Sequence, residues 1–463
     1  MDRLLPSFGP PVFPLAATPA RPRWDALLVS LAVLVSLQVW RVQELVPGLA
    51  LYGLPVATTG VAGLLFWLDR DPRRRLRGLD PAVVRDALGI LVLVTLSIPT
   101  SLYPAASAAF LLKDYSRSVI LMLLLAGSIR GFDDLRRLAW IELGGVTLFS
   151  AIIVARSQIG ADGRLRDLAY YDVNDLAMLI VCTLPLGLYL WRPPARLVTR
   201  GVLLGATGFL MLMLGKTASR GAFLGLLAVA GYLLLRFHGV SRAKRLTAVA
   251  LLAVLLVALA NDSYFDRIET ILHPSADYNW SGKSETGRIE IWKRGLGYMV
   301  SHPVFGVGAA TFGIAEGTLA PEARRLREYG RGFKWSAPHN SWIEIGAEVG
   351  VLGPILLTAL LVAAFRVLAR VRRGAPGEGA ELAQALTASL LAFVVTAFFL
   401  SQAYAAYLYA LLGMIVGLGR LVPAPRAPRA PRAPRPPAPA LRRVSGLAPS
   451  GAVDAVSAAP RPR

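Results

Sequence analysis

One stretch of the sequence combines a histidine with two carboxylates in a pattern that could do chemistry. The stretch is APHNSWIEIGAEVGVLGP, in which His339 and Asn340 precede Glu344 and Glu348. Asn340 is a plausible helix N-cap, and the two glutamates share one face of the helix that follows. Carboxylates buried one and two turns into an apolar helix need charged partners. A histidine placed above two such carboxylates, with arginines available to face them, is therefore a candidate site.

Two further stretches carry cations beside apolar runs. KTASRGA forms a very short turn that contains Lys216 and Arg220. Both cations could reach toward the membrane interface or belong to a site, and their spacing alone leaves both interpretations open. SETGRIEIWKRGLGYMVSHPVFGVGAATF places Arg288 and Trp292 on one helix face. We interpret His302, directly before a proline, as a residue at the end of that helix, followed by a glycine-shaped loop.

Long apolar runs must position these residues, because 55% of the 463 residues are hydrophobic and only 17% are charged. In lipid, a helix bonds its backbone groups within one segment, and strand-type alternation is absent from the sequence. We therefore predict an all-α integral membrane protein with about twelve membrane-spanning helices. The predicted spans are 26–39, 48–68, 87–100, 115–129, 138–155, 176–191, 201–214, 222–235, 246–260, 342–364, 383–400 and 405–421.

The orientation follows from basic residues that cluster in alternate loops. With this set of spans the clusters fall on one side, which the positive-inside rule assigns to the cytoplasm. Residues 1–25 and the tail 422–463 are then cytoplasmic, and 26–421 form the membrane domain. A large loop, 261–338, lies on the outer (periplasmic) face between the ninth and tenth spans, with short amphipathic helices on the membrane. The tail contains PAPRAPRAPRAPRPPAPA and is predicted to be disordered, with arginines that could touch membrane lipids.

Composition argues against several other function classes. The basic loops explain the formal net charge of +21, so we expect no nucleic-acid partner. The sequence has no Walker-type phosphate loop and no H-E-x-x-H motif, and its apolar runs are nearly free of mid-span charges. The single cysteine, Cys182, permits no intrachain disulfide and no cysteine-based metal site. We expect no metal and no cofactor, and we place the chemistry at the outer membrane surface.

Taken together, the motifs resemble those of the O-antigen ligase and polysaccharide polymerase superfamily. They occur in the order SRG, G-R-x-x-x-W, HP-x-x-G-x-G and HN-S-W-x-E. The stretch YYDVNDLA, which contains Asn174, is similar to a further segment of the family. The resemblance covers residues 174–354, and the late outer loop fits it as well. These motifs do not separate one member of the superfamily from another.

The resemblance implies a metal-independent glycosyltransferase of the O-antigen ligase type in the bacterial plasma membrane. Such enzymes move a glycan from an undecaprenyl-pyrophosphate carrier to the hydroxyl of a lipid or glycan acceptor on the outer face. Arg220 and Arg288 match the functional arginines, and His339 matches the functional histidine. Guanidinium groups suit a pyrophosphate leaving group, and a neutral histidine can take the acceptor proton. One of the two glutamates is expected to orient a catalytic cation. The expected substrate-binding residues are Lys216, Trp292, Asn340, Glu344 and Glu348.

A ligase of this kind would act in cell-surface polysaccharide or lipopolysaccharide biosynthesis. Several alternatives to the ligase remain open. An O-antigen or exopolysaccharide polymerase would join repeat units on the same lipid carrier. A protein glycosyltransferase of the superfamily would use a protein as acceptor. From a different class, a small-anion membrane transporter would need paired broken helices and charges near the midplane, which the sequence does not indicate.

Overall fold

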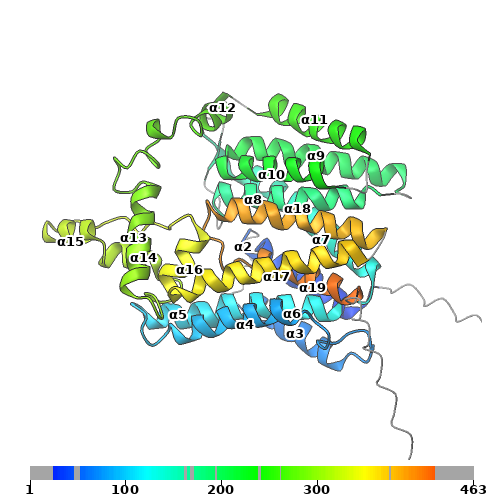
Figure 1. The fold of residues 1–463 in the computed structure, drawn as a ribbon, viewed down its shortest axis with the longest axis horizontal. Helices are drawn as coiled ribbons and strands as arrows, with labels where there is room; N and C mark the ends of the chain where they lie inside the picture. The colour runs from blue at the N-terminus through cyan, green and yellow to red at the C-terminus, as the bar shows by residue number, and fades with distance from the viewer. Residues whose placement is uncertain are drawn as a thin grey trace, which may run out of the picture. The chain divides into compact units, whose positions relative to one another are not determined.

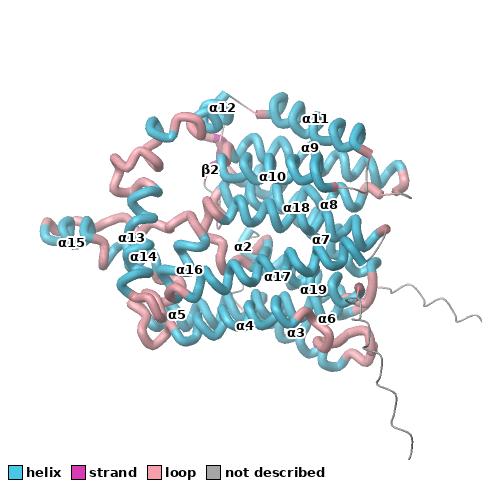
Figure 2. Tube along the Cα trace, viewed as in Figure 1, coloured by secondary structure: helices cyan, strands magenta, loops and turns pink. Residues whose placement is uncertain are grey.

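The computed structural model is almost entirely helical in the residues that it describes (Figures 1 and 2). These residues are 24–45, 53–160, 164–166, 171–192, 195–237, 241–260, 262–374 and 377–422. Within them, β structure is limited to the antiparallel pair of β1 (Gln158–Ile159) and β2 (Leu165–Arg166). The predicted all-α class is thus confirmed for this part of the chain. Most of the predicted N-terminal segment and nearly all of the predicted tail lie outside the described residues.

The apolar runs form helices that pack side by side. In chain order these are α1 (Ala26–Val39), α3 (Leu54–Leu68), α4 (Pro81–Leu96), α6 (Ser116–Ser128), α7 (Phe132–Arg156), α8 (Val173–Leu190), α9 (Leu197–Thr217), α10 (Arg220–Arg236), α11 (Arg242–Leu259), α17 (Leu352–Gly374), α18 (Glu378–Ala397) and α19 (Ala406–Leu421). Short elements between them are α2 (Val42–Leu45), α5 (Pro104–Phe110) and the π-helix η1 (Leu111–Tyr115). The largest contacts join α19 to α6, and α18 to α8 and α10.

By length and apolar composition, α7, α8, α9, α17 and α18 can each cross a membrane. The described part of the chain thus gives five spans, or six if the bent pair of α11 and α12 (Asp262–Glu269) is one span. That number is below the predicted twelve or so, because several apolar runs form short helices. α1, for example, has 14 residues, which rise about 21 Å, less than the hydrocarbon core of about 30 Å.

The predicted span 342–364 is interrupted, which corrects the sequence-based assignment. Its first part is α16 (Ser341–Val349), which ends at Gly350 with φ +86°, and α17 follows from Leu352. The run is continuously apolar, so composition alone predicts one helix, whereas a glycine in the left-handed region ends it. A segment outside the helix also bonds to α16: the backbone N–H of Val307 donates to the carbonyl of Ala347 at 2.8 Å.

The predicted loop 261–338 contains a series of short helices at one end of the helix bundle (Figure 1). After α12 these are η2 (Pro274–Ala276), α13 (Arg288–Ser301), α14 (Phe312–Thr318) and α15 (Pro321–Glu328). A small apolar core joins α13 and α14 to α16 through Ile291, Phe312 and Ile343. As predicted, His302 lies at the end of α13, as its C-cap, and a glycine-shaped loop follows, with positive φ at two of its glycines.

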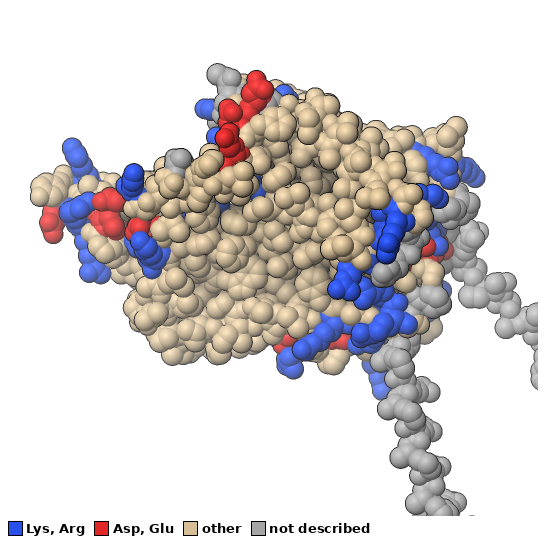
Figure 3. Space-filling view, turned by 45° about the horizontal axis from the view of Figure 1, so that its top comes forward, with Lys and Arg blue, Asp and Glu red and all other residues tan. Residues whose placement is uncertain are grey.

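Ion pairs draw the predicted basic loops together at one end of the fold. Arg74 and Arg130 both contact Asp25, at 2.7 and 2.6 Å, and Arg136 contacts Glu378 at 2.6 Å. On the face drawn in Figure 3, Lys and Arg gather toward the two ends, and a wide uncharged band separates them. Such a band between charged ends is the pattern of a helix bundle that sits in a bilayer.

Candidate active site

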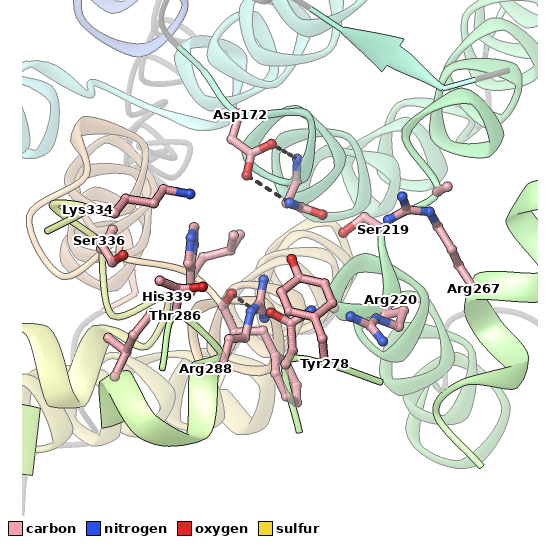
Figure 4. A pocket seen from close by; sticks show the side chains of 18 of the residues that line it. Asp172, Ser219, Arg220, Arg267, Tyr278, Thr286, Arg288, Lys334, Ser336 and His339 are labelled. Carbon is pink, nitrogen blue, oxygen red and sulfur yellow. Dashed lines mark hydrogen bonds between the residues drawn. The ribbon is translucent and has the colours of Figure 1, made fainter. Parts of the chain in front are cut away.

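A cavity of about 420 Å³ collects all three residues that the sequence predicts to be catalytic (Figure 4). Arg220, Arg288 and His339 line it, and each comes from a different motif. The other walls are formed by the residues before α8, the turn between α9 and α10, α12, and the segment that follows α18. The fold therefore brings together side chains that are far apart in the sequence.

Arg220 lies at the first position of α10, directly after a tight turn. Ala218 adopts a left-handed conformation with φ +48°, and the Ser219 hydroxyl caps α10. The guanidinium forms an ion pair with Asp277 and donates to the Thr270 hydroxyl at 2.8 Å. Burial lowers the pKa of Arg220 to about 10, and the nearby positive charge of Arg288 adds to this effect. Arg220 remains charged at neutral pH and is fixed by the 261–338 segment.

Arg288 is the first residue of α13 and lines the cavity. Its guanidinium donates to the backbone carbonyl of Phe399 at 3.3 Å, and no described carboxylate forms an ion pair with it. Burial lowers its pKa, because desolvation disfavours the charged form. A half-buried arginine without a carboxylate partner leaves donor capacity for an anion.

His339 stands between the 261–338 segment and α16. Its φ is +47°, and its backbone N–H donates to the Ser401 hydroxyl at 3.1 Å. Asn340 follows it and caps α16 by accepting from the backbone N–H groups of Trp342 and Ile343. Burial and then the positive charge of Arg288 lower the pKa of His339 to about 4. The imidazole is therefore neutral at pH 7 and can accept a proton.

Positive charge dominates the described lining of the cavity. Its cations are Arg164, Arg220, Arg267, Arg288 and Lys334. Asp172 is the acidic residue among the described lining residues, and its carboxylate accepts from the Asn174 side-chain amide at 2.8 Å. The excess of cations suits a ligand with several negative charges, such as a phosphate ester.

Comparison with known families agrees with the motif pattern. Residues 203–358 match the family model described as O-Antigen ligase. The chain carries an O-antigen ligase domain. This domain includes Arg220, Arg288 and His339, and the superfamily resemblance read from the motifs is thereby confirmed. No curated protein matches the chain. Together with the apolar helices, the match to the family model indicates an integral membrane protein.

None of the five expected substrate-binding residues is among the described lining residues of the cavity, but Trp292 and Asn340 lie next to His339 or contact its neighbour. Trp292 donates its indole N–H to the carbonyl of Pro338 at 2.7 Å and so holds the residue before His339. Asn340 serves as the helix cap that the sequence predicts. Lys216 lies in the last turn of α9, and the tight turn before α10 separates it from Arg220.

Glu344 and Glu348 do not form the ion pairs that we expected. Glu344 accepts from the backbone N–H of Ala403 at 3.2 Å, and Glu348 accepts from the backbone N–H of Phe312 at 3.2 Å. The carboxylate that holds a predicted catalytic cation is instead Asp277. The helix periodicity correctly places both glutamates inside the fold, but each carboxylate accepts a hydrogen bond from a backbone N–H and not from the arginines to which we had assigned it.

The sequence interpretation did not single out several residues of the cavity. Arg164, Arg267 and Lys334 lie in segments that it placed on the face poor in basic residues. The argument used for Lys216 and Arg220, that cations on this face are unexpected, applies equally to them. No sequence pattern of this kind identifies Asp277, because its ion pair with Arg220 depends on how the 261–338 segment folds.

Proposed function

We propose that the chain is a ligase-type glycosyltransferase that moves a glycan from an undecaprenyl-pyrophosphate carrier to the hydroxyl of a lipid or glycan acceptor. The observation that carries the proposal is the cationic cavity in which Arg220, Arg288 and His339 meet. A pyrophosphate leaving group gains negative charge as the sugar–phosphate bond breaks, and fixed guanidinium groups stabilise that charge. The O-antigen ligase domain supports the same class of reaction.

In the proposed step, the neutral imidazole of His339 accepts the proton of the acceptor hydroxyl. The acceptor oxygen forms a bond to the anomeric carbon of the glycan, and the bond from that carbon to the phosphate oxygen breaks. The electron pair of the broken bond stays on the pyrophosphate, which Arg220 and Arg288 hold. The products are the glycosylated acceptor and the lipid pyrophosphate, and the imidazolium returns its proton to solvent.

Donor binding should also strengthen the base. Arg288 lowers the pKa of His339, so a pyrophosphate bound at Arg288 offsets part of that positive charge. The pKa of His339 then rises toward its ordinary value when the donor is in place. The histidine becomes a better proton acceptor at the moment when the leaving group is available.

The positions of the basic loops indicate on which side of the membrane the cavity opens. The basic loops lie near the Glu378 end of α8, where Tyr189 donates to Glu378 at 2.8 Å, whereas Asp172 at the other end of α8 lines the cavity. If the basic loops are cytoplasmic, the cavity opens toward the periplasm of the bacterial inner membrane. The lipid-linked donor would approach it from the outer leaflet.

The test is transfer by the purified chain in lipid nanodiscs, with an undecaprenyl-pyrophosphate-linked glycan and a panel of lipid and glycan acceptors. The proposal predicts that a whole glycan appears on an acceptor while the lipid pyrophosphate is released. Growth of the glycan on its carrier would instead identify a polymerase. No transfer to any acceptor, with the donor intact, would contradict both.

Chelation tests the proposal that arginines neutralise the leaving group without a metal. We expect transfer to continue at its full rate after EDTA treatment, because Arg220 and Arg288 supply the positive charge. The measurement is the transfer rate before and after chelation, and again after Mg²⁺ or Mn²⁺ is added back. A rate that falls with EDTA and returns with either metal would count against the arginine-based mechanism.

A further inference from the structure

A second cavity, of about 1060 Å³, lies next to the cationic one. α1, α2, α3 and η1 form most of its walls, and apolar side chains such as Leu37, Val56 and Phe110 contribute to them. The segment after α18 closes the remaining side. This cavity is larger than the first and combines apolar with polar lining, so it suits an amphipathic molecule.

Several polar atoms of this cavity are buried and have no hydrogen-bond partner among the described residues. They include the side-chain carbonyl oxygens of Gln38 and Gln43, one carboxylate oxygen of Glu44, and Nε of Arg117. Both glutamines are at least nine-tenths buried, and both already use their amide N–H groups. Gln38 donates to the Thr59 hydroxyl and Gln43 to the Leu37 carbonyl, each at 3.2 Å. Buried polar atoms of this kind need a partner, and three of these four are acceptors.

Asp114, Glu44, Arg41 and Arg117 of the second cavity pair with one another, whereas Lys113 and Glu344, which also line it, form no ion pair among the described residues. Asp114 contacts Arg41 at 3.4 Å and Arg117 at 3.2 Å, and Glu44 contacts Arg41 at 3.6 Å. An anionic group would compete with these carboxylates. Hydroxyl groups, in contrast, can donate to the unpartnered oxygens and accept from Arg117 without disturbing the ion pairs. The chemistry therefore favours a neutral, hydroxyl-rich headgroup, such as a sugar, over a phosphate.

The two cavities share one wall. Phe399 and Leu400 line the cationic cavity, and the next two residues, Ser401 and Gln402, line the second one. The Ser401 hydroxyl accepts from the backbone N–H of His339 at 3.1 Å. A headgroup in the second cavity thus lies on the other side of a single backbone segment from the proposed base.

We propose that the second cavity binds the acceptor, an amphipathic molecule whose sugar hydroxyls meet Gln38, Gln43, Glu44 and Arg117 and whose apolar part lies against Leu37, Val56 and Phe110. The assignment of this ligand as the acceptor rests on the proposed transferase function. The binding of a hydroxyl-rich amphipath does not rest on that function, because it follows from the unpartnered polar atoms and the apolar walls of the cavity.

Photocrosslinking of the purified chain in nanodiscs tests the binding. The probes are a photoreactive dodecyl glucoside and a photoreactive dodecyl phosphate with the same alkyl chain, and labelled peptides are identified by mass spectrometry. We expect the glucoside to label peptides of α1–α3 and η1, and an excess of unlabelled dodecyl glucoside to compete. Equal or stronger labelling of these peptides by the phosphate, or no labelling by the glucoside, would overturn the assignment of ligand chemistry.

A matched pair of variants on α3 locates the binding. Val56→Trp fills the cavity from a position that is 52% exposed, and Val61→Trp makes the same change at a position 51% exposed that is not among the lining residues. Val56→Trp should lower glucoside labelling, and raise the KM for the acceptor, by about tenfold or more. Val61→Trp should change neither value. Equal effects of the two variants would contradict the site.

The two measurements also separate this proposal from the proposed function. If the wild-type chain transfers no glycan but its glucoside labelling still responds to Val56→Trp, the binding site stands and the transferase function falls. If the wild type transfers glycan and Val56→Trp leaves the acceptor KM unchanged, the function stands and the acceptor site falls.

Discussion

At the scale of single residues, the cationic cavity places a neutral histidine beside an arginine that forms no ion pair with a described carboxylate. His339 and Arg288 could be singled out from the sequence because each belongs to a short motif with a recognisable spacing. Asp277, which holds Arg220, could not, because an ion pair between distant segments leaves no local pattern. The same limit explains why we assigned Glu344 and Glu348 to arginines, although each carboxylate accepts from a backbone N–H instead.

The pH dependence of transfer follows from the pKa of His339. A proton acceptor must be neutral, and His339 is protonated only as the pH falls through about 4. In the free enzyme, the acidic limb of kcat/KM should therefore lie near pH 4 and not near the ordinary histidine value of about 6.5. Arg288→Gln removes the positive charge that lowers this pKa, so its residual activity should show the limb at higher pH. A wild-type limb near pH 6.5 would contradict the role of His339 in this environment.

At the scale of elements, turns and short segments between the long helices carry most of the residues that line the cationic cavity. The composition of the apolar runs predicted where helices occur in the chain. It could not predict that 342–364 breaks into α16 and α17, because the break depends on Gly350 and on backbone hydrogen bonds from the loop after α13. The first of the two pieces, α16, begins at Ser341, and its N-cap Asn340 directly follows His339.

The close contact between the loop after α13 and α16 gives a test at this scale. Gly306 has φ +64°, and a Cβ at this position would collide with the backbone of Glu348. Gly330 has φ +68°, but nothing lies within 4 Å of where its Cβ would be. Gly330→Ala should cost about 1–2 kcal/mol of stability from backbone strain alone. Gly306→Ala should lower the thermal unfolding midpoint further and reduce transfer. Equal midpoints for the two variants would mean that this contact does not hold α16.

At the scale of the whole membrane domain, the basic loops and the cationic cavity lie toward opposite ends of the helices. The sequence predicted this separation from alternating basic clusters and one long polar segment, which are long-range features of composition. The predicted number of about twelve spans is not confirmed, since length and composition support five or six in the described residues, and composition does not distinguish a short apolar helix from one long enough to cross the bilayer core.

Accessibility of a cysteine tests the predicted orientation. We expect Ser284→Cys, in the 261–338 segment, to react with a membrane-impermeant thiol reagent in intact spheroplasts, because this segment lies at the end away from the basic loops. Cys182 is buried, and Cys182→Ser removes the remaining background. A cysteine placed at Ser241, in the loop between α10 and α11, is the matched control and should react only after lysis. The reverse pattern would place the cavity in the cytoplasm.

The central claim is that the cationic cavity carries out glycan transfer, and the most direct measurement is the single-turnover transfer rate of His339→Ala. His302→Ala is the matched control, because His302 ends α13 and is not among the residues that line the cavity. We predict that His339→Ala inserts normally and loses about a hundredfold or more in rate, with comparable losses for Arg220→Ala and Arg288→Ala. His302→Ala should stay close to the wild-type rate. A normally inserted His339→Ala protein that transfers glycan at a near wild-type rate would contradict the account.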